Sequence, residues 1–284
     1  MILITGASGS VGREVLREMQ KTGEAVCAMY RSKEDEGKAP AGVKTVIADF
    51  SDTASLLKAL QGVERVYLVC SPIQELVELE GNAIDACKRA GVRTIVLNSA
   101  LGAGDYDKSF PSWHRKVEDK LKASGMAWTI LRPNGFMQNT ITYLAPSIRA
   151  QGVFYDAMSG AKTSYIDVRD VAAVAAKALT SAGHDGKTYE LNGPEAITQD
   201  DLAKRIAAKA GRDVKHVNIP REAHQKAMLD LGMPEWQVKA LIELQDYYVS
   251  GRAAAVDGVV AKLLGRPERT IDAFLTENAA EFRA

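Results

Sequence analysis

Short runs of β-branched and other apolar residues alternate with helical segments through the first two-thirds of the chain. The helical segments repeat apolar residues every three or four positions, as Val11, Val15 and Met19 do, which is typical of a helix with one buried face. Strands and helices in regular alternation predict a parallel sheet covered by helices on both faces. The predicted strands span Ile2–Thr5, Ala25–Tyr30, Thr45–Ala48, Arg65–Cys70, Thr94–Ser99 and Trp128–Leu131.

The alternation becomes less regular after Trp128. Thr198 and Asp201 have the spacing of a capping box, which predicts a helix that begins there and ends at Gly211. The pattern predicts a large domain over residues 1–182, with some crossover segments, and a smaller α/β lobe over residues 183–284 that packs onto it as one wall of a cleft. Elements expected after Trp128 are helices over Asn139–Gln151, Asp170–Thr180, from Pro220 and over Trp236–Tyr248, and strands over Thr163–Asp167, Lys187–Leu191 and Val214–Ile219.

Composition excludes several classes of protein. The 284 residues are 46% hydrophobic, and 36 Lys and Arg balance 36 Asp and Glu, so the chain has no electrostatic signature of nucleic-acid or membrane binding. The three cysteines form no C-x-x-C pair, which argues against a disulfide framework or a thiolate metal site. Without a targeting signal or an apolar run near the ~18 residues that span a bilayer, we expect a cytoplasmic protein without a metal.

A glycine loop stands directly between the first predicted strand and the first predicted helix. Gly6, Gly9 and Gly12 follow a G-x-x-G-x-x-G spacing, which differs from the common dehydrogenase G-x-G-x-x-G. Gly6 allows a tight turn, Gly9 lets the main chain approach a pyrophosphate, and Gly12 lets the helix pack close to the sheet. The phosphates then meet the N–H groups at the positive end of that helix. The loop predicts a Rossmann-type fold that binds a dinucleotide.

The residues after the second predicted strand indicate which dinucleotide binds. An NAD site places a carboxylate there to bind the ribose 2′-hydroxyl, but this chain has Arg31 followed by Lys33. A guanidinium suits a 2′-phosphate, so we predict NADP(H). Glu34 and Asp35 follow closely and leave an NAD ribose site open, and Arg31 as a solvated loop residue is the other alternative.

Later strands supply further candidates at the same edge of the sheet. Asp49 can accept a hydrogen bond from an adenine amino group and Phe50 can flank the base, although Asp49 as the cap of the next helix is an alternative. The predicted cofactor-binding residues are Gly6, Ser8, Gly9, Ser10, Val11, Gly12, Arg31, Asp49, Phe50, Cys70, Ser71, Pro72, Ser99, His114, Pro133 and Asn134.

These motifs resemble the atypical short-chain dehydrogenase/reductases. Three segments, Trp113–Glu118, Thr129–Asn139 and Tyr189–Glu195, are similar to the NmrA-like group, and within it to bacterial NADPH-dependent quinone oxidoreductases and triphenylmethane-dye reductases. The resemblance runs nearly from end to end. It implies an oxidoreductase that transfers hydride from NAD(P)H to a small aromatic or quinone-like acceptor. The alternative is an NmrA-type redox-sensing regulator that binds NADP(H) without turnover, and a homodimer is left open.

The wider superfamily reduces carbonyls with a Tyr-x-x-x-Lys pair on the helix after strand five. Here Phe110 stands at the tyrosine position and His114 at the lysine position, and Lys116 points about 200° away on a helix. Because phenylalanine has no proton to give, alcohol–ketone interconversion and sugar-nucleotide epimerisation are disfavoured. A quinone can instead take hydride and acquire its proton from water.

The predicted catalytic residues lie on two segments. His114 contacts the nicotinamide ribose, protonates the acceptor, or is only a helix-surface histidine. Phe136 presents an apolar surface beside the nicotinamide, or packs between the lobes. Trp236, Tyr247 and Tyr248 form a facing wall, or belong to the core. The predicted catalytic set is Phe110, His114, Asn134 and Phe136.

Overall fold

The computed structural model describes residues 1–283, which divide into two compact units. The units interleave along the chain. The first contains residues 1–104, 111–132 and 168–190, and the second contains residues 105–110, residues 133–167 and the chain from Leu191 onward. This division differs from the predicted boundary after residue 182, because residues 133–167 belong to the second unit and residues 183–190 belong to the first.

The first unit is built on a seven-stranded sheet with the order β3-β2-β1-β4-β5-β6-β8. Ile2 in β1 lies opposite both Val26 in β2 and Arg65 in β4, and these pairs are parallel. Strand order reverses at β1, so the loop after β1 lies at the point where open α/β sheets bind ligands. The predicted parallel sheet is thus confirmed. Its strands are β1 (Ile2–Ile4), β2 (Val26–Tyr30), β3 (Lys44–Ile47), β4 (Arg65–Leu68), β5 (Thr94–Asn98), β6 (Ala127–Pro133) and β8 (Lys187–Leu191).

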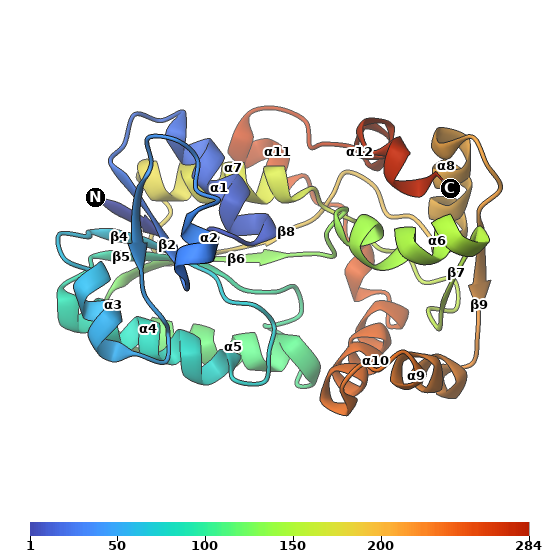
Figure 1. The fold of residues 1–284 in the computed structure, drawn as a ribbon, viewed down its shortest axis with the longest axis horizontal. Coiled ribbons are helices and arrows are strands. Elements are labelled where there is room, and N and C mark those ends of the chain that lie inside the picture. The colour runs from blue at the N-terminus through green and yellow to red at the C-terminus, as the bar shows by residue number, and fades with distance from the viewer. Residues whose placement is uncertain (284) are drawn as a thin grey trace. The chain divides into compact units, whose positions relative to one another are not determined.

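Helices cover both faces of this sheet (Figure 1). On one face, α1 (Ser10–Gln20) packs against α7 (Val168–Thr180), whose alanine-rich sequence allows close approach. The other face is covered by α3 (Thr53–Ala59), α4 (Leu76–Ala90) and α5 (Ser109–Lys122). The short α2 (Lys33–Glu36) follows β2. Helices on both faces explain why the central strands are apolar along their whole length rather than alternating.

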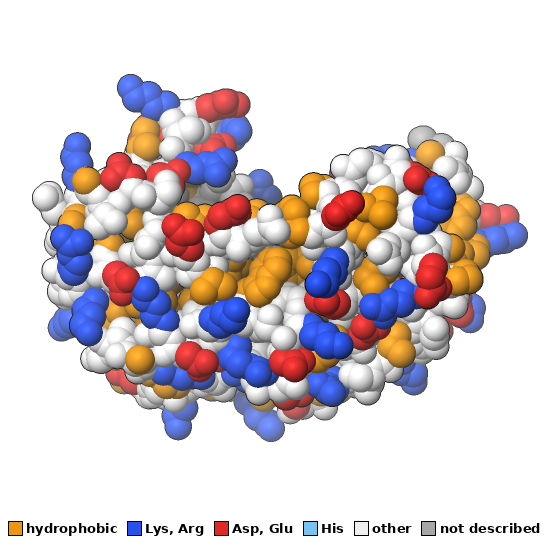
Figure 2. Space-filling model, turned by 90° about the horizontal axis from the view of Figure 1, so that it is seen from below, with side chains coloured by type: hydrophobic (Ala, Val, Ile, Leu, Met, Phe, Trp, Pro, Cys, Tyr) orange, Lys and Arg blue, Asp and Glu red, His pale blue; other side chains and the backbone are white. Residues whose placement is uncertain are grey.

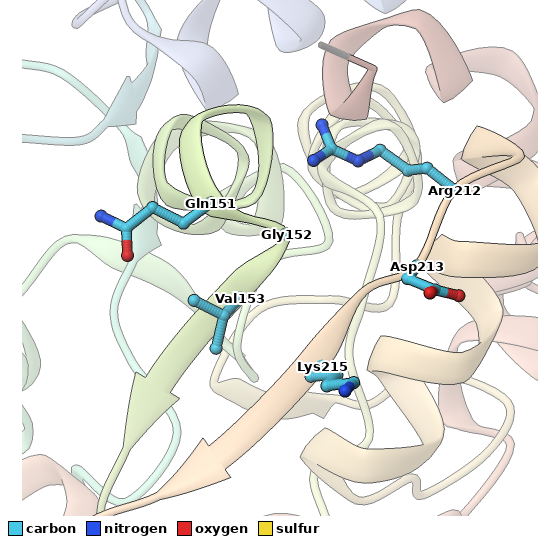
Figure 3. A pocket seen from close by; sticks show the side chains of 6 residues that line it. All are labelled: Gln151, Gly152, Val153, Arg212, Asp213 and Lys215. Atoms are coloured by element: carbon cyan, nitrogen blue, oxygen red, sulfur yellow. The ribbon is translucent and has the colours of Figure 1, made fainter.

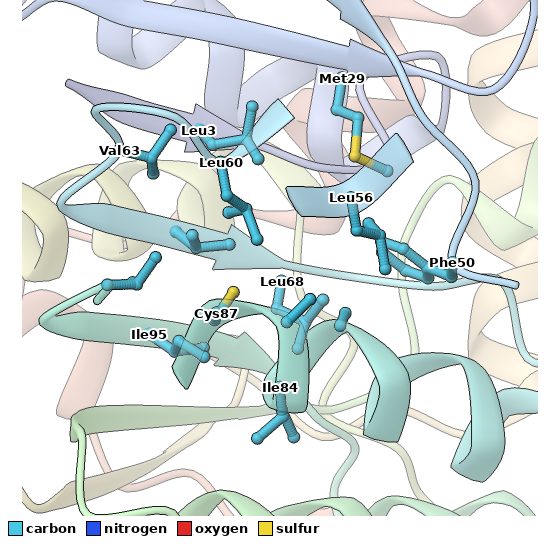
Figure 4. Packing of buried hydrophobic residues seen from close by; sticks show 14 of the residues in the cluster. Leu3, Met29, Phe50, Leu56, Leu60, Val63, Leu68, Ile84, Cys87 and Ile95 are labelled. Carbon is cyan, nitrogen blue, oxygen red and sulfur yellow. The ribbon is translucent and has the colours of Figure 1, made fainter. Parts of the chain in front are cut away.

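The core beneath α3 and α4 is formed by strand and helix side chains that meet across the sheet face (Figure 4). Leu3 and Leu68 come from β1 and β4, whereas Leu56 and Ile84 come from the two helices. All four are at most 2% exposed. Burial of each such side chain stabilises the fold by roughly 1.5–3 kcal/mol. This core therefore holds the strands, and the loops at their carboxyl ends, in fixed positions.

The second unit has a smaller core around a two-stranded parallel sheet, β7 (Val153–Asp156) and β9 (Lys215–Asn218). Buried Phe154, Ile206 and Phe274 belong to this core. The capping box is confirmed, because Thr198 Oγ1 accepts from the Asp201 N–H and Asp201 accepts from the Thr198 N–H. The helices of this unit are η1 (Thr140–Leu144), α6 (Ala145–Gln151), α8 (Gln199–Ala210), α9 (Arg221–Asp230), α10 (Glu235–Val249), η2 (Arg252–Ala254), α11 (Val259–Leu264), α12 (Ile271–Glu277) and η3 (Ala279–Phe282).

Two predicted elements of the second unit differ from the structure. The helix expected over Asn139–Gln151 is a π-helical turn, η1, followed by α6. Pro146 lies in the first turn of α6, and because proline cannot donate a main-chain hydrogen bond, a regular α-helix does not continue through it. The strand expected over Thr163–Asp167 is reduced to isolated bridges, Thr163 to Ile197 and Ile166 to Phe136. No helix within residues 1–283 is long and apolar enough to cross a membrane.

Candidate functional site

The glycine loop has the geometry that its spacing predicts. Gly6 adopts a φ of +57°, and a Cβ there would lie 2.7 Å from Val69 Cγ1. A Cβ on Gly12 would overlap the Gly6 carbonyl oxygen. At Gly9 the single protein atom near a Cβ is the Gly6 oxygen, at 3.2 Å, and Gly9 is exposed. Gly6 and Gly12 are therefore required by the protein itself, whereas Gly9 keeps the outer side of the loop open to a ligand.

The N-terminus of α1 is open to an anion. Gly9 precedes α1 without a capping side chain, and the first turn contains no acidic residue. By contrast, Asp52 caps α3 by accepting from the N–H groups of Ala54 and Ser55. Uncapped N–H groups at the positive end of a helix bind phosphate oxygens. Ser8 and Ser10 are exposed in the same loop, while Val11 is buried and anchors the helix.

Arg31 is exposed and has no hydrogen bond or ion pair with any residue in the described part of the chain. Two of the three carboxylates that follow it are engaged elsewhere, whereas Glu34 is exposed. Asp35 accepts hydrogen bonds from Ser32 Oγ and Lys38 Nζ, each at 3.2 Å, and Glu36 accepts from Thr45 Oγ1 at 2.6 Å. Asp35 is therefore held at α2 by these hydrogen bonds, and the Arg31 guanidinium after β2 is open to a ligand.

Asp49 lies near Arg31 at the end of β3. Hydrogen bonds from the Ser51 side chain and main chain hold the pKa of Asp49 below its ordinary value, and the Arg31 charge adds to this effect. Because Asp52 caps α3, the alternative that Asp49 caps this helix is wrong. Phe50 is 9% exposed and belongs to the core cluster, so little of its surface is available to flank a base.

The end of β4 contributes Cys70, Ser71 and Pro72 to the same edge. Ser71 and Pro72 are exposed and Cys70 is half-buried. Burial raises the pKa of the Cys70 thiol to about 12, so at neutral pH this group is an uncharged thiol rather than a nucleophilic thiolate. The segment can line a ligand but supplies no nucleophile.

Phe110 and His114 lie one turn apart on α5, which the structure extends from Ser109 to Lys122. His114 is 7% exposed, and its Nδ1 is buried without a hydrogen-bond partner in residues 1–283. Burial lowers the pKa of His114 to about 4, and the nearby Glu118 only partly opposes this. The imidazole is therefore neutral at pH 7, which favours a positioning role over donation from an imidazolium.

Glu118, one turn after His114, ties α5 to the sheet. Arg132 binds it with two hydrogen bonds of 2.9 and 2.7 Å, and Ser99 Oγ donates to it at 2.7 Å. Burial favours the neutral acid, but the hydrogen bonds from Arg132 and Ser99 outweigh it and lower the pKa of Glu118. The Ser99 hydroxyl is thus used inside the protein, and Ser99 acts on the site through the position of α5.

Asn134 and Phe136 belong to the second unit, and Pro133 ends β6 before them. Asn134 Nδ2 donates to Asn192 Oδ1 and to the Ala253 carbonyl, each at 2.9 Å, and its Oδ1 accepts from the Gly135 N–H at 2.7 Å. Three hydrogen bonds engage the whole amide, so Asn134 fixes the loop rather than contacting a ligand with its side chain.

Two tyrosines that lie far apart in the sequence meet at Gly135. A Cβ on Gly135 would be 3.4 Å from both Tyr165 Cε1 and Tyr248 OH. Tyr247, by contrast, is 3% exposed and packs against the tilted ring of Tyr106, with ring centroids 5.3 Å apart and planes at 59°. Tyr247 is thus a packing residue and Tyr248 faces the loop. The sequence indicated Tyr248 only as part of an aromatic group, and it gave no signal for Tyr165.

A pocket of about 420 Å³ lies elsewhere in the second unit (Figure 3). It opens where α6 ends at Gly152, and Arg212, Asp213 and Lys215 contribute charges of both signs. None of the predicted site residues lines it.

Within residues 1–283, no group of three or more His, Cys, Asp or Glu side chains has a geometry that could hold a metal ion. Positive and negative side chains are also interspersed on the face seen in Figure 2.

Comparison with known proteins agrees with this geometry. A family model described as NAD(P)H-binding matches residues 6–182. The chain is 37% identical to the NAD(P)H azoreductase of Xenophilus azovorans, with 100% of both chains covered. It is 31% identical to an NADPH-dependent quinone oxidoreductase of Escherichia coli solved with NADPH, with a TM-score of 0.89 and 99% of each chain covered. The Citrobacter triphenylmethane reductase has the same fold, at 23% identity and a TM-score of 0.88 over 98% of this chain and all of that one.

Proposed function

On the premise that the chain belongs to the NAD(P)H-binding family, we propose that it is an NADPH-dependent reductase that transfers hydride to a flat, conjugated acceptor such as a quinone. The observation that carries the cofactor is the open N-terminus of α1 beside the unpaired guanidinium of Arg31. The acceptor class is supported by relatives named as an azoreductase and a quinone oxidoreductase.

The residues at the carboxyl edge of the sheet fit NADPH group by group. Gly9 and the first N–H groups of α1 would hold the pyrophosphate, and Arg31 would pair with the 2′-phosphate. Asp49 would accept from the adenine amino group, with the exposed Ser71 and Pro72 beside the ribose. The bound cofactor supplies the hydride and the protein supplies orientation and exclusion of water.

The groups on α5 suit an acceptor that needs no acid from this helix. Phe110 has no proton to donate, and His114 is neutral because burial lowers its pKa to about 4. A neutral imidazole can accept a hydrogen bond from a ribose hydroxyl, which holds the nicotinamide in place. Quinone reduction consumes one NADPH and one proton from solvent, so this arrangement is sufficient for the reaction, whereas an unactivated ketone would lack its acid.

The acceptor would lie on the loop of the second unit that carries Asn134 and Phe136. Asn134 fixes this loop by its three hydrogen bonds, and Phe136 provides an aromatic surface for stacking. The test is NADPH oxidation against a panel of quinones, azo dyes and triphenylmethane dyes, beside a binding titration with NADPH. NADPH binding without turnover of any acceptor would support the redox-sensing regulator instead.

Location and assembly remain predictions of the sequence. We propose that the protein works in the cytoplasm and leave a homodimer as the alternative to a monomer. Light scattering coupled to size-exclusion chromatography decides the second point, because the chain mass is 30.7 kDa.

A further inference from the structure

In the second unit, we infer that Tyr248 donates a hydrogen bond to the carbonyl oxygen of a bound quinone and thereby selects for acceptors that develop charge on oxygen. This inference rests on the proposed function and identifies the acceptor contact that the sequence leaves unassigned. The observations that carry it are the position of the Tyr248 hydroxyl at Gly135 and its lack of a partner within the protein.

The loop that Tyr248 faces is held rigidly. The Gly135 N–H donates to Asn134 Oδ1 at 2.7 Å, and the Ile166 N–H donates to the Gly135 carbonyl at 3.0 Å. The Met137 N–H then donates to the Ile166 carbonyl at 2.9 Å. Both sides of Gly135 are therefore fixed by hydrogen bonds. The Tyr248 hydroxyl lies against this rigid loop, 3.4 Å from the position that a Cβ on Gly135 would take.

The Tyr248 hydroxyl has no hydrogen-bond partner among residues 1–283, although the side chain is half-buried. Three other shielded tyrosines have one. Tyr67 donates to Asn98 Oδ1 at 3.0 Å, Tyr106 donates to the Glu243 carbonyl at 2.7 Å, and Tyr165 accepts from Gln199 Nε2 at 3.0 Å. A shielded tyrosine hydroxyl normally finds a partner, so the unpaired hydroxyl of Tyr248 is available to a ligand.

Both tyrosines at Gly135 remain neutral hydroxyls over the physiological pH range. Burial raises the pKa of Tyr248 to about 12, and burial likewise raises the pKa of Tyr165. A neutral phenol donates a hydrogen bond but does not repel an oxygen that gains negative charge. Gln199 fixes the Tyr165 side chain by donating to its oxygen, and the Tyr165 ring lies at the same point of Gly135 as the Tyr248 hydroxyl.

The reaction gives this hydrogen bond a defined role. In quinone reduction the C–H bond of the reduced nicotinamide breaks, its electron pair moves with the hydride to the quinone, and negative charge develops on a carbonyl oxygen. A solvent proton then completes the hydroquinone, and Tyr248 keeps its own proton. A cationic triphenylmethane dye takes hydride at its central carbon and becomes neutral, without a proton and without charge on oxygen. Tyr248 therefore stabilises the first reaction and not the second.

The test compares the two acceptors in one isosteric variant. Tyr248→Phe should lower kcat/KM for a benzoquinone by about 10- to 100-fold, the range expected for a hydrogen bond to a charged oxygen. Turnover of crystal violet and the Kd for NADPH should be unchanged. The melting temperature should also be unchanged, since the lost hydroxyl leaves no protein group unpaired. Tyr155→Phe, an exposed tyrosine on β7, is the matched control and should behave as wild type.

Each outcome decides a separate point. Equal loss with both acceptors, or no loss with the quinone, would overturn the role of Tyr248 while leaving the reductase intact. Absence of turnover by the wild-type protein would overturn the proposed function, and the inference with it. A second variant, Gly135→Ala, keeps the hydroxyl but places a methyl 3.4 Å from it. This variant should also slow the quinone more than the dye, and equal effects on both acceptors would contradict the inference.

Discussion

The dinucleotide edge of the first unit and the acceptor loop of the second unit are built from different parts of the chain. At the edge, the main chain would do most of the proposed binding, because Gly9 and the uncapped start of α1 leave N–H groups open to a ligand. At the loop, the main chain is already paired around Gly135, and the side chains of Tyr165 and Tyr248 lie against it. On the proposed function, the first region would bind a constant group, and the second could change its ligand by changing side chains.

This difference predicts opposite sensitivities to substitution. A phosphate site made of N–H groups depends on backbone shape, so a single methyl can close it. A surface made of aromatic and hydroxyl side chains tolerates conservative substitutions, and such substitutions change which acceptor is preferred. Substitutions in the first region should therefore reduce NADPH affinity, whereas substitutions in the second should change acceptor preference.

Gly12→Ala should have the largest effect. The new Cβ would overlap the Gly6 carbonyl and approach the Thr5 oxygen to 2.9 Å, so the glycine loop must move. We expect NADPH affinity to fall by more than about a hundred-fold, with a lower melting temperature. Gly81→Ala on α4 is the control, since its Cβ would meet only the flexible Lys120 side chain. Calorimetric NADPH titration of Gly12→Ala with near wild-type affinity would contradict the assignment of the loop.

Arg31→Asp should invert the choice of dinucleotide. The wild-type protein should bind NADPH about ten- to a hundred-fold more tightly than NADH, as a charge-assisted pair with the 2′-phosphate predicts. The carboxylate of the variant would repel that phosphate and accept from a ribose hydroxyl. Lys33→Ala, two residues further on, should leave most of the preference in place. Equal Kd values for both dinucleotides in the wild-type protein would show that Arg31 has no such role.

His114→Ala should have a smaller and more selective effect. If the neutral imidazole positions the ribose, NADPH affinity falls while quinone turnover at saturating NADPH stays within a few-fold of wild type. Because the pKa of His114 is about 4 in the folded protein against 6.5 for an ordinary histidine, saturated turnover should be independent of this group between pH 6 and 8. A large loss of saturated turnover with unchanged NADPH affinity would instead assign proton donation to His114.

The same pKa shift makes folding stability depend on pH. Between pH 6.5 and 4 the unfolded chain binds a proton at His114 that the folded protein does not, so the free energy of unfolding should fall as the pH falls through this window. His114→Phe removes the titrating group and should flatten this part of the stability curve, as measured by urea unfolding. His224→Phe, a histidine on the exposed α9, serves as the control.

Glu80→Gln should show the opposite pH dependence of folding stability. Glu80 is fully buried on α4 without a side-chain partner in residues 1–283, and burial raises its pKa from 4.5 to about 8. Between these values the folded state binds the extra proton, so stability should fall as the pH rises through the window. Above pH 8 the variant should therefore melt a few degrees higher than wild type, whereas Glu78→Gln on the exposed side of α4 should not. Identical melting curves for Glu80→Gln and wild type at pH 9 would refute this account.

The first region could be predicted from the sequence because its signals are local. Gly6, Gly9 and Gly12 lie within one turn-forming segment, and Arg31 follows a strand whose apolar pattern is clear. The second region depends on contacts across the chain, since Gly135, Tyr165, Gln199 and Tyr248 meet only through folding. Tyr165 also lies in a segment predicted as a strand, which the structure reduces to isolated bridges. The periodicity of apolar residues along the sequence does not reveal such long-range contacts.

The interleaved units have the same cause. The sequence predicted one boundary after residue 182 and assigned the strand at Lys187–Leu191 to the smaller lobe. The structure places residues 187–190 in the first unit and residues 133–167 in the second. Strand β8 joins the sheet beside β6, whereas the segment after β6 leaves the sheet. Only the hydrogen-bond partners of these segments distinguish the two cases, and the pattern of apolar residues along the sequence does not reveal those partners.

The most direct test of the central claim is NADPH oxidation by a benzoquinone under anaerobic conditions, followed at saturating NADPH together with hydroquinone formation. The account predicts one hydroquinone for each NADPH consumed, a marked preference for NADPH over NADH, and no oxidation of a secondary alcohol with NADP⁺. Tight NADPH binding without consumption in the presence of any quinone or dye would contradict it, and robust oxidation of the alcohol would contradict it equally.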